Sequence, residues 1–203
     1  MKTQEINKLF KEYLEKHKTI MTLDGVVDEK EENILFILKE SNTDNRKDIG
    51  IKEFWFKNVF SVKSKNVNEY YEPKGIALTR DHKKSQTKYY NCISKIKNEY
   101  DKKFGKDYGI FYININKEGG GAISHGIDIK EWLTCKEKRD FLIKQIRILA
   151  PEKVVVFSAP VVGSKIIDIL HSADIPDANI NKAAFHPSRY TDSQIEQFLE
   201  EVK

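Results

Sequence analysis

The residues of this chain that could carry chemistry stand where apolar segments end. In AAFHPSRY (183–190) an apolar run leads directly into His186, Pro187 and Ser188. A histidine can donate a hydrogen bond to an oxygen that gains negative charge in a transition state. A serine hydroxyl can bond a phosphate or cap a turn, and the proline stops a strand ladder. His186 is therefore a candidate catalytic residue, against the alternative of an exposed histidine in a strand-to-helix turn.

A second polar group lies in YININK (112–117), where Asn114 and Asn116 are two residues apart and share one face of a strand. An amide donates and accepts at once, so it can recognise the edge of a nucleobase. Asn116 can equally be the residue that ends the strand. The glycine run at 119–121 would let backbone amides approach a phosphate, or it is a plain loop. It matches neither GxGxxG nor a P-loop.

A third polar group, Glu40, Ser41 and Asn42, follows the apolar run ILFILK (34–39). A carboxylate at this place could orient a water or stabilise a cation. Acidic residues are also common in solvated loops, which is the alternative interpretation.

Alternating strand and helix patterns position these groups. Apolar runs predict strands at 33–39, 110–115, 153–158 and 183–186. Helical spacing predicts helices at 2–17, 84–103, 128–149, 161–172 and 191–202. Such alternation predicts a three-layer α/β/α sandwich with a mainly parallel central sheet, in which ligands bind outside the carboxyl ends of the strands. We expect one domain over 1–203, with 1–32 as an N-terminal helical extension that packs on the core.

Composition limits the classes of function. The 203 residues include 35 basic and 31 acidic ones, and the net charge of +4 permits nucleic-acid binding without demonstrating it. The sequence lacks the roughly 18-residue apolar stretch of a membrane span, and its charged start lacks a signal-peptide core, so we expect a cytoplasmic protein. Cys92 and Cys135 are far apart and form no CxxC, which argues against a disulfide framework and against a four-cysteine metal or iron–sulfur site. We expect a monomer without metal or cofactor.

Taken together, these segments resemble the uracil-DNA glycosylase superfamily over about residues 33–203. LIKQIRILAPEKVVVFSAPVVGSKI (142–166) is similar to the family's helix, proline, buried strand and following helix, and AAFHPSRY resembles its HPS motif. YININK resembles the strand whose asparagine reads uracil, and Asn114 precedes a lysine by three residues, as in the iron–sulfur branch. The cysteines of that branch are missing. ILFILKESN lies where the family has its water-activating loop, but Lys39–Thr43 contains neither glycine nor proline.

The resemblance implies a DNA partner and hydrolysis of the N-glycosidic bond of uracil or a related deaminated base, after the base has left the duplex. His186 would stabilise the departing base anion, and Glu40 or Asn42 would position water or offset the charge of the sugar. Asn114, with Asn116 beside it, would select the base. The DNA backbone would be held by Ser188, Arg189, Lys117, Gly119 and Gly120.

Two other functions stay open. A nucleic-acid- or nucleotide-binding protein could keep this fold without the reaction, and the altered first loop favours it. An unrelated α/β enzyme could act on a small phosphorylated ligand, in which case free nucleotide would bind tightly and DNA weakly. Salt separates these two, because a protein that contacts several phosphates loses affinity steeply as salt rises.

Overall fold

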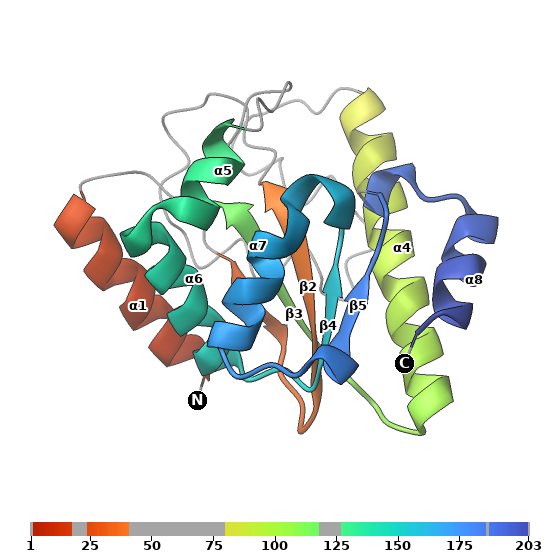
Figure 1. Cartoon of the computed structure of the whole chain (residues 1–203). Coiled ribbons are helices and arrows are strands. Elements are labelled where there is room, and N and C mark those ends of the chain that lie inside the picture. Colours follow the sequence, from red (N-terminus) through yellow and green to blue (C-terminus); the bar gives the residue numbers. More distant parts are fainter. Residues whose placement is uncertain (1, 18–23, 41–79, 118–126, 186, 203) are drawn as a thin grey trace.

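The computed structural model describes residues 2–17, 24–40, 80–117, 127–185 and 187–202, and these residues form a mixed α/β fold (Figure 1). Five strands form one sheet in the order β1-β3-β2-β4-β5. Their bounds are β1 Gly25–Asp28, β2 Asn33–Glu40, β3 Gly109–Asn116, β4 Lys153–Val156 and β5 Ile180–Lys182. β1 runs antiparallel to β3, and the other pairs are parallel. The expected alternation and mainly parallel sheet are confirmed.

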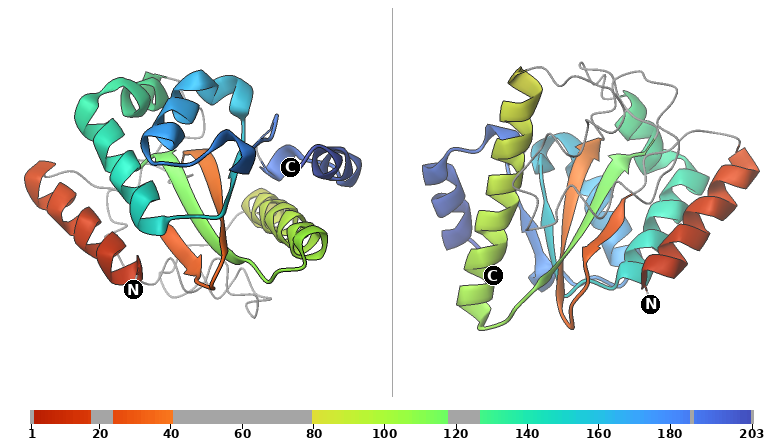
Figure 2. Two further views of the ribbon diagram at one scale, coloured as in Figure 1. Left: turned by 60° about the horizontal axis from the view of Figure 1, so that its bottom comes forward. Right: turned by 180° about the vertical axis from the view of Figure 1, so that it is seen from behind.

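Helices lie against both faces of the sheet (Figures 1 and 2). One face is covered by α1 (Lys2–His17), α5 (Ile127–Thr134), α6 (Lys136–Leu149) and α7 (Ala159–Ser172), and we call it the α6/α7 face. The opposite, α4/α8 face carries α4 (Arg80–Phe104) and α8 (Asp192–Glu200). Two short 3-10 turns, η2 (Asp177–Asn179) and η3 (Pro187–Arg189), flank β5.

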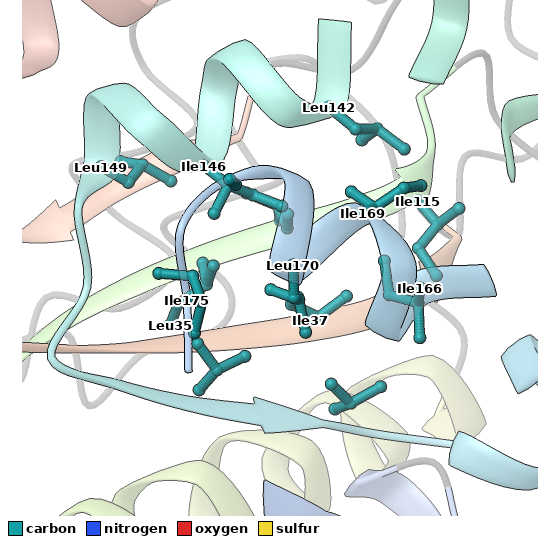
Figure 3. Packing of buried hydrophobic residues seen from close by; sticks show 14 of the residues in the cluster. Leu35, Ile37, Ile115, Leu142, Ile146, Leu149, Ile166, Ile169, Leu170 and Ile175 are labelled. Carbon is teal, nitrogen blue, oxygen red and sulfur yellow. The ribbon is translucent and has the colours of Figure 1, made fainter. Parts of the chain in front are cut away.

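Side chains of the central strand β2 alternate between two apolar cores. Leu35 and Ile37 point to the α6/α7 face, where they meet Ile146 of α6 and Leu170 of α7 (Figure 3). The intervening Phe36 belongs to the core beneath α4 and α8. A strand buried on both faces reads as a continuous apolar run, which is why NILFILK predicts it from sequence alone.

The helix expected over 128–149 is interrupted in the structure. α5 ends at Thr134, and Cys135 has the extended dihedral angles φ −65° and ψ 123° before α6 begins. The Thr134 hydroxyl donates to the carbonyl of Lys130 at 2.7 Å. Threonine and cysteine are weak helix formers, and such a back-bond competes with a regular helix. Because the apolar residues keep helical spacing on both sides of Cys135, the sequence pattern predicts one continuous helix.

The last strand begins and ends earlier than the sequence pattern predicts. β5 covers Ile180–Lys182 and the described residues 183–185 form no strand, so the strand expected at 183–186 is wrong over these residues. β4 likewise ends at Val156. Ala183 still donates to the carbonyl of Val156 at 2.8 Å. Beyond it the neighbouring strand has ended, so the ladder stops and the chain instead bonds to the start of α7.

The N-terminal region contains a strand as well as a helix. α1 confirms the expected helix, and its Ile6 and Phe10 are buried in the core. β1, a four-residue edge strand, was not predicted, because GVVD is too short for a period-2 pattern to stand out. The aromatic segment EFWFKNVF (53–60), whose composition is compatible with a short helix, lies outside the described residues.

Gly109, the first residue of β3, is required by close backbone contacts. A Cβ atom there would lie 2.2 Å from Oδ1 of Asn33 and 2.3 Å from the carbonyl oxygen of Asp28. The second of these is a backbone atom and cannot swing away. We expect Gly109→Ala to lower the free energy of unfolding by about 3 kcal/mol, the upper end of overpacking costs, as measured by urea unfolding.

Gly105→Ala is the matched control. Gly105 has a φ of +64°, but a Cβ there would meet no atom within 4 Å. Only the left-handed backbone is penalised, at about 1–2 kcal/mol. Equal losses in the two variants would contradict the steric explanation for Gly109.

Candidate functional site at the carboxyl edge of the sheet

The carboxyl ends of the parallel strands meet at one edge of the sheet, the upper edge in Figure 1. There β2 and β3 lie side by side in register, with Leu38 opposite Asn114 and Glu40 opposite Asn116. The polar segments that follow β2 and β3 in sequence therefore begin next to each other. This juxtaposition of the second and third polar groups is the one expected from the sequence.

The segment after β5 reaches the same edge. The amide of Ala159 donates to the carbonyl of Ala183 at 3.0 Å, and the amide of Ser158 donates to the carbonyl of Phe185 at 3.3 Å. These bonds tie residues 183–185 to the end of β4 and the start of α7. η3, which follows, lies against α4 (Figure 1).

A topological switch point lies at this edge between β2 and β4. After β2 the next described helix, α4, lies on one face, whereas α7 follows β4 on the other face (Figure 2). In open α/β sheets the two connections diverge at such a point and leave a crevice outside the carboxyl ends, where ligands bind. Glu40 and Ser158, the latter with a left-handed φ of 55°, flank this place.

Asn114 is buried, and its amide contacts one neighbouring hydroxyl. The Tyr112 hydroxyl lies 3.0 Å from Oδ1 and 2.8 Å from Nδ2 of Asn114. Because a hydroxyl can donate to the amide oxygen or accept from the amide nitrogen, both contacts are compatible with hydrogen bonding. Tyr112 is half-buried and shares the α4/α8 face of β3 with Asn114. Asn116 is buried as well.

Lys117 forms a buried ion pair with Asp24. Its Nζ lies 2.7 Å and 2.9 Å from the two carboxylate oxygens of Asp24, and both side chains are fully buried. The sequence suggested a phosphate contact for Lys117, but its ammonium faces the α6/α7 core rather than solvent. In YININK the alternation places Lys117 on the opposite side of the strand from the two asparagines.

Asp24, the residue before β1, is hydrogen-bonded to both β3 and α6. Its Oδ2 accepts from the backbone amide of Asn114 at 2.6 Å, and its Oδ1 accepts from Nε2 of Gln145 on α6 at 2.7 Å. Burial raises the pKa of Asp24, and the charge of Lys117 opposes that rise. Burial lowers the pKa of Lys117, with Asp24 acting in the opposite direction. The cluster fixes the end of β3, which carries Asn114.

No local sequence pattern indicated a role for Asp24, because its partner Lys117 is 93 residues away along the chain. Gln145 did leave one. It interrupts the apolar stripe of α6 formed by Phe141, Leu142, Ile146 and Leu149. A polar residue within such a stripe indicates a buried hydrogen-bond partner.

Several sequence-predicted site residues lie outside the described residues, namely His186, Asn42, Gly119 and Gly120. For Glu40 and Ser188 the structure gives the backbone position, at the end of β2 and within η3. Arg189, also in η3, is exposed. The described segments therefore bring Glu40, Asn114 and Asn116 to the same edge as η3.

The described residues contain neither a metal-ligand cluster nor a membrane-spanning helix. No cluster of three or more histidine, cysteine, aspartate or glutamate side chains in this part of the chain could hold a metal ion. Among the helices that the structure describes, none combines the length and apolar character needed to cross a bilayer.

Fold and edge together define a mixed α/β protein with a mostly parallel five-stranded sheet and a polar carboxyl edge. Compared with known proteins, the chain matches no family model, no curated protein and no solved structure.

Proposed function

We propose that this protein is a DNA base-excision glycosylase on a three-layer α/β/α sandwich of the uracil-DNA glycosylase type. It would hydrolyse the N-glycosidic bond of uracil or a related deaminated base, with DNA as its partner, as a cytoplasmic monomer in DNA repair. One observation supports this most: the ends of β2 and β3 and the segment that leads into His186-Pro187-Ser188 reach one edge of the sheet. These are three of the four segments that carry the resemblance.

The proposed reaction breaks the bond between the sugar C1′ and the base nitrogen. The electron pair leaves with the base, and His186 stabilises the resulting anion by a hydrogen bond to its carbonyl oxygen. Water adds to C1′ under the direction of Glu40 or Asn42, and the proton it releases balances the one that the base anion takes up. Asn114 selects the base through its amide, with Asn116 as a second candidate. Ser188 and Arg189 hold the backbone.

A nucleic-acid- or nucleotide-binding protein without catalysis is the second candidate function. Two observations favour it. The amide of Asn114 is already in contact with Tyr112. Residues 39–43, the first two of which end β2, lack the glycine and proline of the water-activating loop. Binding without base release would support this candidate.

Single-turnover base excision tests the proposal. Labelled oligonucleotides containing uracil, hypoxanthine or xanthine, both single- and double-stranded, would be incubated with excess wild-type protein and with His186→Ala. We expect wild type to release one of these bases and His186→Ala to release it at least about 10²-fold more slowly. Oligonucleotide binding with no release of any base would reject the glycosylase in favour of the binding protein.

A further inference from the structure

Phe185 is a large apolar side chain left in solvent beside the candidate site. It is 45% exposed, and it is the one large hydrophobic side chain that the described part of the chain leaves exposed. Other aromatic side chains near this edge are covered, such as Phe157, which is fully buried. A single exposed apolar residue is common on protein surfaces and by itself indicates no ligand. The position of Phe185 and the contacts that hold it are more specific.

The backbone of Phe185 is fixed on both sides. Its carbonyl accepts from the amide of Ser158 at 3.3 Å, and its own amide donates to the hydroxyl of Tyr190 at 3.4 Å. Neither bond uses the Phe185 side chain. Any residue with a backbone N–H could make them, so these bonds do not require an aromatic ring at this position.

The ring is nevertheless supported by a row of aromatic side chains that leads into the core. Phe185 packs against Tyr190 with ring centroids 5.8 Å apart and an interplanar angle of 71°. Tyr190 in turn packs against Phe157, and Phe157 stacks on Phe36 of the central strand. An exposed ring whose backbone and neighbours are fixed loses little conformational freedom when a ligand stacks on it.

The charge and position of the surroundings indicate what that ligand is. Two exposed cationic residues, Lys182 and Arg189, lie three and four residues away along the chain from Phe185. Sites for single-stranded nucleic acid combine aromatic rings, on which bases stack, with cations that follow the phosphates. A protein partner would be expected to meet a larger apolar area than one ring.

We propose that Phe185 is a stacking platform for an unpaired nucleobase, with Lys182 and Arg189 contacting the adjacent phosphates. This inference rests on the proposed function in taking nucleic acid as the partner. It adds a contact outside the base-selecting residues, at a nucleotide that neighbours the excised one. Phe185 therefore contributes to strand binding and takes no part in bond cleavage.

Binding of a labelled single-stranded oligonucleotide, followed by fluorescence anisotropy, tests this proposal. We expect Phe185→Ala to weaken binding about 5- to 150-fold, the range for loss of one base–aromatic stack. Phe185→Trp should bind as tightly as wild type, and its indole fluorescence should be quenched by the oligonucleotide. Phe185→Leu, which keeps apolar area without a π face, should resemble Phe185→Ala.

Salt dependence separates the ring from the cations. Between about 50 and 200 mM salt, Phe185→Ala should keep the wild-type slope of log affinity against log salt, whereas Arg189→Ala should reduce the slope by about 1. Lys102 is a matched exposed cation near the end of α4, and Lys102→Ala should change neither the affinity nor the salt slope. Thermal unfolding of Phe185→Ala should show a folded protein with at most a small drop in melting temperature, because the half-exposed ring loses its contact with Tyr190.

Three results would overturn the inference: unchanged binding in Phe185→Ala, full rescue by leucine, or no binding of oligonucleotide by wild type. Base excision tests the proposed function independently of the stacking inference. If wild type binds but does not excise, and Phe185→Ala binds more weakly, the stacking platform stands while the glycosylase falls. If wild type excises a base and Phe185→Ala reaches half-maximal excision at the same protein concentration, the glycosylase stands and the stacking platform is rejected.

Discussion

Lys117→Met is expected to lower the free energy of unfolding by about 3–5 kcal/mol, because it leaves the Asp24 carboxylate buried without its counter-charge. Both side chains of this pair have no exposed surface. The remaining contacts of the carboxylate, from the Asn114 amide and the Gln145 side chain, are neutral donors. Urea unfolding of wild type and variant at neutral pH measures the loss.

The stability of Lys117→Met and that of Asp24→Asn should depend on pH with opposite signs. Burial already raises the pKa of Asp24 above its ordinary 3.8, and removal of Lys117 raises it further. The folded state of Lys117→Met then binds a proton more tightly than the unfolded state, so its stability deficit should shrink as pH falls from 7 towards about 4. A deficit that grows over this range would contradict the assignment.

Asp24→Asn leaves the opposite charge uncompensated. Burial lowers the pKa of Lys117 below its ordinary 10.5, and loss of the carboxylate lowers it further. The folded state then releases the lysine proton more readily than the unfolded state. The deficit of Asp24→Asn should therefore shrink as pH rises from 7 towards about 10.

The double variant Asp24→Asn/Lys117→Met separates charge from packing. It removes both charges, so it should be more stable than the sum of the single losses predicts, with a coupling of about 1–3 kcal/mol. Lys102→Met is the control, because its ion pair with Glu99 is exposed and should be worth less than about 1 kcal/mol. Additive losses in the double variant would show that the pair contributes only as two packed side chains.

Sequence patterns predicted the fold where one element carried its own signal. α1 and α4 follow helical spacing, and β2 and β3 are continuous apolar runs, so local periodicity was enough. The parallel sheet followed from the alternation of these elements. The short edge strand β1 and the break at Cys135 were missed, because four residues and one extended residue leave no periodic trace.

The candidate site was predictable only to the level of strands and their ends. Asn114 and Glu40 reach one edge because parallel strands share a direction, which sequence can indicate. Which face each side chain meets depends on register and on partners far along the chain. Lys117 shows this: one residue beyond Asn116, it turns to the other face and meets Asp24. Its positive charge suggested a phosphate contact, but its position directly after β3 directs its side chain into the core.

Asn114→Ala is expected to separate function from folding, in contrast to Lys117→Met. Its amide contacts the hydroxyl of Tyr112, which is half-buried and can bond water instead, so the free energy of unfolding should fall by only about 1 kcal/mol. If Asn114 selects the base, single-turnover excision should fall about 10²- to 10³-fold, the cost of one lost polar contact to a transition state.

Asn33→Ala provides the matched control. Asn33 is a buried asparagine at the start of β2, at the opposite edge of the sheet, where it accepts from the amide of Lys30 at 2.9 Å and donates to its carbonyl at 2.8 Å. Loss of these two bonds should destabilise the protein at least as much as Asn114→Ala. Excision per folded molecule should nevertheless stay at the wild-type rate, because this edge carries none of the candidate site.

The comparison of the two asparagines decides what the Asn114 result means. Loss of excision in Asn114→Ala alone would place base selection at the carboxyl edge of β3. Equal loss in both variants would attribute the effect to a weakened fold, and wild-type excision by Asn114→Ala would remove Asn114 from the site. Tyr112→Phe tests the first outcome further. If the Tyr112 hydroxyl contacts the Asn114 amide only in the absence of a base, this variant should excise at least as fast as wild type.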